Sequence, residues 1–271
     1  MAIKSERYLI GWFSTGRDEA ARDLLRTVCT SIEQGEINAK ICFVFSNREP
    51  GEAAESDLFL ELVRGYQMPL ICLSSRAFKQ SCGEAWRTEF EKEAMRRIND
   101  FRPDLCVLAG YMLIVGAEMC RKYPMINLHP AAPGGPQGTW QEVIWRLMEE
   151  GAEETGVMMH LVTPELDKGP PVTYGTFSLR GEPFDRYWDK IKGRSIEEVK
   201  NQEGENNPLF REIRKHGLAR EFPLIIATLK AFSEGRVRIA GGRVVDSIGT
   251  GTEGYNLSQE IDEKVTEALA E

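Results

Sequence analysis

Short apolar runs alternate with longer amphipathic segments along the first half of the chain. Runs rich in β-branched or aromatic residues predict strands at 8–13, 39–46, 69–75, 104–111 and 125–129. Segments of helical length and composition separate these runs, most clearly at 18–34, 54–64 and 84–98. Because strands that alternate with helices are typical of parallel sheets, the pattern predicts an open, mostly parallel, doubly wound α/β fold with helices on both faces.

The second half of the chain continues this pattern with one helix and two more strands. The pattern predicts a helix at 140–149 and strands at 155–163 and 171–179, and the sequence PELDKGP provides the turn between the strands. Residues 181–207 are polar and contain Pro, Gly and Asn, so they predict a loop or short helices. An amphipathic helix is expected at 221–232.

The C-terminal segment contains a hairpin signal and a misleading glycine motif. The sequence VRIAGGRVV predicts a small hairpin whose two glycines form the turn. The sequence GTGTEG at 249–254 matches GxGxxG, but too few residues follow it for a nucleotide-binding unit. We interpret it as a link to a final helix at 257–268. The expected division is a main domain, 1–240, followed by a C-terminal segment, 241–271.

Composition and charge narrow the range of functions. With 271 residues, 42% of them hydrophobic and 28% charged, the chain is large enough for a core that needs no disulfide or metal. The net charge of −8 argues against a nucleic-acid partner. Six scattered cysteines without a CxxC pair indicate reduced thiols and no metal site. Neither a signal peptide nor a membrane span is recognised, so we expect a cytoplasmic protein that acts on small molecules.

Two polar side chains at the end of a predicted strand are the first candidates for catalysis. Side chains alternate along a strand, so Asn127 and His129 share one face, and Pro130 and the glycines after it end the strand there. Parallel α/β sheets place their ligand crevices at such strand ends. His can move a proton near neutral pH, and an Asn amide can donate to an oxygen that gains negative charge. The alternative is a structural histidine with an asparagine that holds the turn.

Three further residues bear on this site. Asp167 lies in the turn PELDKGP, where its carboxylate could reach an imidazole, although an aspartate in a turn is more often a local cap. His160 alternates with apolar neighbours and faces either the site or the core. His216 lies in a polar segment and is expected at the surface.

The loop after the first strand is a candidate anion site. Ser14, Thr15, Gly16 and Arg17 lead into a predicted helix, whose N-terminus presents free N–H groups to an anion such as phosphate. The sequence matches neither common phosphate-binding motif, so an ordinary helix cap is the alternative.

Taken together, these motifs resemble the folate-dependent formyltransferases. The ordered series FSTGRDEAARDLL, VFSN, PDLCVLAGYMLIV, INLHP and GVMMHLVTPELDKGP carries the resemblance, which covers residues 8–171 well and 221–239 loosely. Among these enzymes the glycinamide ribonucleotide formyltransferases are the most similar.

The resemblance implies transfer of a formyl group from 10-formyltetrahydrofolate to a primary amine, without a metal. Asn127 and His129 would then stabilise the oxyanion and His129 would shuttle the proton, while Asp167 would orient the imidazole or a water. The phosphate of the ribonucleotide would bind at residues 14–17. The implied folate contacts are Met112, Leu113, Ile114, Thr163 and Glu165.

The chain departs from the family pattern on the side of the amine acceptor. The loop 131–139 differs from the family sequence, a glutamate that the family uses near the acceptor is replaced by Leu218, and 181–216 is longer than in the family. Pro130 and Glu221 are therefore the candidate contacts to the acceptor. Alternative functions are formylation of an amino sugar or sugar nucleotide, hydrolysis of formyltetrahydrofolate, and folate sensing without catalysis. A homodimer is compatible with the sequence.

Overall fold

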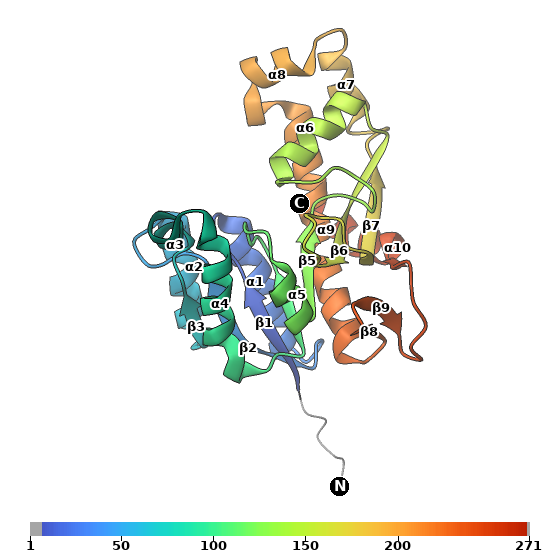
Figure 1. Cartoon of the computed structure of the whole chain (residues 1–271). Coiled ribbons are helices and arrows are strands. Elements are labelled where there is room, and N and C mark those ends of the chain that lie inside the picture. Colours follow the sequence, from blue (N-terminus) through green and yellow to red (C-terminus); the bar gives the residue numbers. More distant parts are fainter. Residues whose placement is uncertain (1–6, 270–271) are drawn as a thin grey trace.

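An eight-stranded sheet organises the protein, which is described here by a computed structural model covering residues 7–269 and side chains up to 265 (Figure 1). The strand order is β10-β7-β6-β5-β4-β1-β2-β3, and neighbouring strands are parallel except in the pairs β5–β6 and β6–β7. The strands are β1 (Tyr8–Phe13), β2 (Ala39–Ser46), β3 (Leu70–Cys72), β4 (Leu105–Leu108), β5 (Met125–His129), β6 (Glu154–Leu161), β7 (Pro171–Ser178) and β10 (Tyr255–Asn256). The predicted fold class is confirmed.

Helices lie on both faces of this sheet, and a separate hairpin follows the longest of them. The helices are α1 (Glu19–Glu33), α2 (Ala54–Gly65), α3 (Ser75–Cys82), α4 (Trp86–Ile98), α5 (Ala117–Lys122), α6 (Trp140–Glu150), α7 (Asp185–Ile191), α8 (Ile196–Gln202), α9 (Pro208–Ser233) and α10 (Ser258–Leu269). The hairpin consists of β8 (Val237–Ala240) and β9 (Arg243–Asp246), as predicted. Within residues 7–269, no helix combines the length and the apolar character needed to span a membrane.

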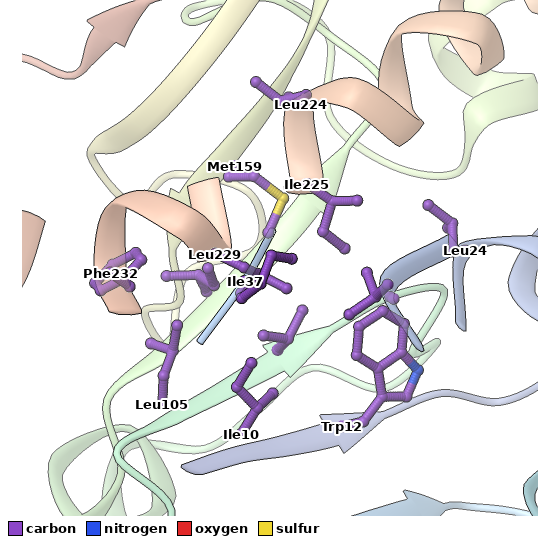
Figure 2. Close-up of a cluster of buried hydrophobic side chains, with 14 of the residues drawn as sticks. Ile10, Trp12, Leu24, Ile37, Leu105, Met159, Leu224, Ile225, Leu229 and Phe232 are labelled. Carbon is purple, nitrogen blue, oxygen red and sulfur yellow. The ribbon is translucent and has the colours of Figure 1, made fainter. Parts of the chain in front are cut away.

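The two faces of the sheet bury two distinct hydrophobic clusters. Figure 2 shows part of the first cluster, in which Ile10 and Trp12 of β1 lie near Leu24 of α1 and Leu229 of α9. The second cluster lies on the opposite face, where Phe13, Phe43 and Phe45 pack with residues of α4 and α5. Side chains alternate along a strand, so Met125 in the second cluster and Ile126 in the first assign Asn127 and His129 to the face of α4 and α5.

The polar segment after β7 folds into a helical lobe at one end of the sheet. Residues 181–207, predicted as a loop or short helices, contain α7 and α8. These helices pack with α6 and the first turns of α9 around a third cluster that contains Trp145, Leu179 and Phe210 (Figure 1). Figure 1 shows this lobe extending away from the sheet on the α6 side of the molecule.

The structure differs from the sequence-based prediction most strongly in α9. This helix begins at Pro208 rather than 221, because Asn207 caps it by accepting hydrogen bonds from the backbone N–H groups of Leu209 and Phe210. Pro208 at the first helical position needs no N–H partner, and Pro223 is tolerated within the helix. The predicted surface position of His216 is wrong: its side chain is 15% exposed, and its ring centroid lies 4.9 Å from that of Phe184.

Three short elements were also missed, and two strands are clearly shorter than predicted. The helices α3 and α5 and the two-residue strand β10 carry too little periodic signal for recognition. The strand predicted at 69–75 is limited to Leu70–Cys72, because α3 begins at Ser75. β4 ends at Leu108 because the chain then turns through Gly110 at φ +68°. The structure connects the C-terminal segment to the rest of the protein: Val244, Ile261 and Val265 belong to the first cluster, and β10 pairs with β7. A division after residue 240 would separate the two strands of the hairpin.

Candidate active site

Two antiparallel strands and the turn that follows them bring the candidate catalytic groups together. β5 supplies Asn127 and His129, and β6 supplies His160 directly opposite Asn127. Asp167 follows in the turn before β7, where its φ of 51° lies in the left-handed region that Asp tolerates better than most residues. The predicted grouping of Asn127, His129 and Asp167 is thus present in the geometry, and the open question about His160 is answered, since it faces the site.

His160 fixes the orientation of the Asn127 amide. Its Nδ1 donates to the backbone oxygen of Leu161 at 3.0 Å, so its Nε2 is left as an acceptor for the Asn127 Nδ2 group at 3.0 Å. The same Nδ2 donates a longer hydrogen bond, 3.4 Å, to Oδ1 of Asp167. The two amide protons therefore point toward His160 and Asp167, and the second bond is the weaker one.

His129 is held between two acceptors. Its Nε2 donates to the Pro136 carbonyl at 2.8 Å, and its Nδ1 lies 3.6 Å from Oδ2 of Asp167. Burial lowers the pKa of His129 below its usual value, although the negative charge of Asp167 and the Pro136 carbonyl act in the opposite direction. The resting ring is therefore neutral at pH 7, and a proton added at Nδ1 would meet a carboxylate.

The Asp167 carboxylate lies next to all three of the other polar side chains, Asn127, His129 and His160. The Asp167 side chain is 6% exposed, and its Oδ2 accepts a hydrogen bond from the backbone N–H of Gly138 at 3.1 Å. Burial alone would raise the pKa of this carboxyl, but the close approach of His160, whose Nε2 lies 3.5 Å from Oδ1, the nearby His129 ring and the Gly138 N–H hold the pKa below the usual value. Asp167 is therefore a carboxylate at neutral pH.

Gly169 allows the turn that carries Asp167 to pack closely against β6. A Cβ atom at Gly169 would overlap the carbonyl oxygen of Leu161 and lie 3.3 Å from Nδ1 of His160. The turn that carries Asp167 can therefore approach β6 closely only with glycine at this position.

A cavity of about 380 Å³ opens over these groups, between two walls of different chemistry. The apolar wall comes from the loops after β4 and β6 and consists of Tyr111, Met112, Leu113, Ile114, Val115, Val162 and Leu166. The charged wall comes from the starts of α1 and α6 and from α9, and consists of Arg17, Asp18, Glu142, Arg214 and Glu221. The catalytic candidates lie in the same cavity, so two different ligands could meet above them.

The proposed folate contacts mostly lie on the cavity surface. Met112, Leu113, Ile114 and Thr163 line it, whereas Glu165 does not and instead forms an exposed ion pair of 3.1 Å with Lys168. The apolar side chains of Met112 and Ile114 are 41% and 42% exposed. Exposed apolar groups at the mouth of a cavity are typical of a surface that a ligand covers.

The predicted phosphate loop is arranged differently from the expectation of open N–H groups. Ser14 and Thr15 are buried and do not line the cavity. The Thr15 N–H donates to the Gly110 carbonyl, and the Thr15 hydroxyl donates to Asn47 and accepts from the Met112 N–H. At the start of α1, the Asp18 carboxylate caps the helix by accepting from the Ala21 N–H. Of the four predicted residues, only Arg17 lines the cavity.

On the acceptor side, the structure places Pro130 and Glu221 in the cavity lining and adds partners that the sequence did not reveal. Arg214 forms an ion pair of 2.7 Å with Glu221, and its guanidinium lies 4.6 Å from the ring centroid of Trp140. A helix that continued back from 221 would have brought 214 onto the face of Glu221, because residues seven apart share a helix face. The signal was missed since the polar stretch before 221 was not recognised as helical.

Titration of the histidines tests these electrostatics. The chain contains three histidines, so their ring signals can be assigned by single His→Gln substitutions. We expect His129 to titrate below pH 6.5, and its midpoint to fall further in Asp167→Asn, because the carboxylate raises the pKa of His129. The measurement is an NMR pH titration, and a midpoint above 6.5 would contradict the assigned effect of burial.

The sequence places the chain in one known class of proteins. Residues 20–177 match the family model described as formyl transferase, so the chain belongs to the formyl transferase family. The resemblance inferred from the sequence motifs is confirmed. In the part of the chain that the structure describes, no group of three or more His, Cys, Asp or Glu side chains is arranged to hold a metal ion.

The individual relatives share only modest sequence identity with this chain. The chain is 34% identical to phosphoribosylglycinamide formyltransferase of Saccharomyces cerevisiae, in an alignment that covers 32% of this chain and 44% of the relative. It is 28% identical to phosphoribosylglycinamide formyltransferase of Escherichia coli, in an alignment that covers 55% of this chain and 64% of the relative. The matched part thus spans less than two thirds of both relatives. A solved phosphoribosylglycinamide formyltransferase from Coxiella burnetii superimposes with a TM-score of 0.67 at 22% identity, over 93% of this chain and 99% of that one, which supports the fold.

Proposed function

We propose that the protein transfers the formyl group of 10-formyltetrahydrofolate to the primary amine of glycinamide ribonucleotide. The observation that carries the proposal is the position of Asn127, His129 and Asp167 in one cavity between an apolar and a charged wall. Membership of the formyl transferase family, and the phosphoribosylglycinamide formyltransferases among the relatives, support the choice of donor and acceptor.

The reaction is a direct acyl transfer. The amine nitrogen attacks the formyl carbon, and the carbonyl oxygen takes up the electron pair and becomes an oxyanion. The Asn127 amide can donate to this oxyanion if it releases its longer hydrogen bond to Asp167, while its bond to His160 keeps the amide in place. Collapse of the tetrahedral intermediate then breaks the bond from the formyl carbon to N10 of the folate.

His129, assisted by Asp167, would transfer the proton from the attacking amine to the leaving N10 atom. The attacking amine loses a proton after it forms the new C–N bond, and N10 must gain one as it leaves. The neutral His129 can accept the proton at Nδ1, where Asp167 Oδ2 lies 3.6 Å away and stabilises the imidazolium. The same proton can then pass to N10, so the enzyme returns to its resting state.

The apolar wall fits the flat ring system of the donor. Met112, Ile114 and Leu166 are between 41% and 46% exposed, and they come from two loops that lie on the same cavity. A planar ring placed between these loops would cover this apolar surface, and the backbone polar groups of the loops could recognise its edge.

Substitution of Ile114 tests this part of the proposal. Ile114→Ser should raise the KM for 10-formyltetrahydrofolate by roughly tenfold, because partial burial of one aliphatic side chain contributes about 1.5 kcal/mol. The kcat should change little, since Ile114 lies outside the catalytic group. Initial rates at varied donor concentration give both constants, and Ile248→Ser, which changes an exposed side chain of the C-terminal segment, is the matched control.

The proposed function is tested by the absorbance change that accompanies deformylation of 10-formyltetrahydrofolate by the purified protein. Reactions would contain glycinamide ribonucleotide, no acceptor, or one of a panel of amino sugars and sugar nucleotides. Turnover that requires glycinamide ribonucleotide, with a formylated product in mass spectrometry, supports the proposal. Equal turnover without an acceptor would identify a hydrolase, and turnover only with an amino sugar would reassign the acceptor.

A further inference from the structure

The loop that forms much of the apolar wall, residues 111–116, is held by side chains from two other parts of the chain. Within residues 7–269, the backbone N–H groups of this loop that donate to a protein acceptor are those of Met112 and Gly116. The Met112 N–H donates to the Thr15 hydroxyl at 3.0 Å, and the Gly116 N–H donates to Oε1 of Glu91 in α4. The stretch between these two points faces the cavity, so its backbone shape depends on the two side chains.

Thr15 belongs to a buried polar network that fixes its hydroxyl. The residue is 3% exposed, and its hydroxyl donates to Oδ1 of Asn47 at 2.7 Å while it accepts from Met112. The Asn47 amide in turn donates to the Ser75 hydroxyl at 3.1 Å. The Thr15 backbone is held as well, because its N–H donates to the Gly110 carbonyl at 3.1 Å. The first support of the loop is therefore oriented by contacts outside the loop.

Glu91 approaches the other end of the loop at a glycine. A Cβ atom at Gly116 would overlap Oε2 of Glu91, so the carboxylate and this backbone N–H can meet only with glycine there. Gly116 precedes α5 and has no side chain with which to cap it, so Glu91 supplies the acceptor. Burial raises the pKa of the Glu91 carboxyl above its usual value, and the Gly116 N–H opposes this effect. The hydrogen bond thus offsets part of the cost of burying the carboxylate.

Packing behind the loop does not replace these two supports. Tyr111 and Val115 pack in the second cluster, which holds the loop at two side chains. Between the loop and α4, however, a recess of about 10 Å³ remains, and its lining includes Trp86, Phe90 and Leu113. A recess of this size has room for about one water molecule, so the middle of the loop lacks close-packed support on that side.

The ring of the donor is rigid and planar, so the wall that receives it has to hold a matching shape. A loop that also samples other shapes binds its ligand more weakly, in proportion to the population that does not fit. We propose that Thr15 and Glu91 are positioning residues for the formyl donor, which hold residues 111–116 in the shape that receives its ring. This inference rests on the proposed formyl transfer, and it assigns Thr15 to the donor side of the site instead of to a phosphate on the acceptor.

Substitutions that keep side-chain volume but remove the acceptor oxygen test the inference. Thr15→Val and Glu91→Met each leave one backbone N–H of the loop without its partner. Thr15→Ser and Glu91→Gln keep an oxygen that can accept the same hydrogen bond, so they separate its loss from a general effect of substitution.

Two substitutions at comparable positions are the matched controls. Thr173→Val removes a buried hydroxyl that is hydrogen-bonded to Thr228 at 2.6 Å. Glu93→Met, on the same helix as Glu91, removes ion pairs with two arginines. Both substitutions lower stability through partners that lie outside the loop, so donor binding should be unchanged. Thermal unfolding of all variants measures how far stability falls in each.

The main readout is the dissociation constant of tetrahydrofolate, which carries the ring of the donor and cannot react, measured by isothermal titration calorimetry. We expect it to rise roughly 5- to 30-fold in Thr15→Val and Glu91→Met, because an unpartnered N–H frees the loop to leave the fitting shape. In Thr15→Ser and Glu91→Gln it should stay within about threefold of the wild type.

Two further measurements separate a positioning role from a general structural one. The KM for the amine acceptor and the kcat at saturating donor should change less than about threefold in every variant, since the charged wall and the catalytic group are unaltered. Amide hydrogen exchange of residues 111–116 in the free protein should become faster in Thr15→Val and Glu91→Met, and remain unchanged in both controls.

Three results would overturn the inference while formyl transfer stands. One is equal affinity for tetrahydrofolate in the wild type, Thr15→Val and Glu91→Met. Another is an equal loss of affinity in Thr173→Val and Glu93→Met, which would reflect stability alone. The third is a raised KM for the acceptor with unchanged folate affinity in Thr15→Val, which would return this residue to the acceptor side. If the wild type neither binds a folate nor transfers a formyl group, the proposed function fails and the inference fails with it.

Discussion

Asp167→Asn is expected to reduce the kcat for formyl transfer by roughly 10³- to 10⁴-fold, the loss seen when a carboxylate that orients a catalytic histidine becomes an amide. The substitution removes the charge beside Nδ1 of His129, so a proton taken up there is no longer stabilised. It also places an NH₂ group among the donors Gly138 N–H and Asn127 Nδ2, where only acceptors fit. Single-turnover rates with saturating substrates measure the effect.

The control for this variant is a charge change in the same turn outside the cavity. Lys168→Gln alters an exposed side chain next to Asp167 and should leave kcat within about threefold, as expected for an exposed ion pair. Circular dichroism and thermal unfolding would establish that both variants are folded. A folded Asp167→Asn enzyme with near-normal kcat would show that the carboxylate has no part in the chemistry.

His129→Ala should reduce kcat by roughly 10²- to 10⁴-fold, because it removes the group that we propose moves the proton. The apolar wall is unchanged by this substitution, so the KM for the folate donor should stay within about threefold. His160→Ala should have the smaller effect, since His160 orients the Asn127 amide through a 3.0 Å hydrogen bond and is not required to carry a proton.

The ranking of the two histidines is the critical comparison. Stopped-flow absorbance on both variants would give kcat, and equilibrium binding of the folate donor would show that its site is intact. A larger loss in His160→Ala than in His129→Ala would exchange their roles. Addition of imidazole offers a second readout, since it should partly restore His129→Ala and leave His160→Ala unchanged.

The regular part of the fold could be predicted because its physical causes are local. Strands buried on both faces leave continuous apolar runs, and β5 was predicted with the bounds that the structure shows, Met125–His129. The grouping of Asn127 and His129 followed from alternation along that strand. The contribution of Asp167 was a hypothesis from its position in a turn, and its hydrogen bonds depend on the antiparallel return of β6, which the pattern did not reveal.

The charged wall of the cavity could not be predicted, because its arrangement depends on contacts between residues that are distant in the sequence. The first half of α9 is polar and contains Gly217. Its helical state depends on the Asn207 cap and on the contacts that Leu209 and Phe210 make in the third hydrophobic cluster. Without that helix, no sequence rule places Arg214 beside Glu221 and Trp140. The internal hydrogen bonds of Thr15 are equally invisible in the sequence, because their partners lie 32 and 97 residues away.

The short strands at the two margins of the sheet have a consequence for behaviour in concentrated solution. β3 has three residues and β10 has two, whereas their neighbours β2 and β7 each have eight. A long strand at a sheet margin can recruit a strand from another molecule and start aggregation. Here the long strands lie one position inside the margin, and the two-residue β10 is followed at once by α10, which packs against β7. By covering the edge of β7, β10 and α10 therefore reduce the pairing of this strand with strands of other molecules.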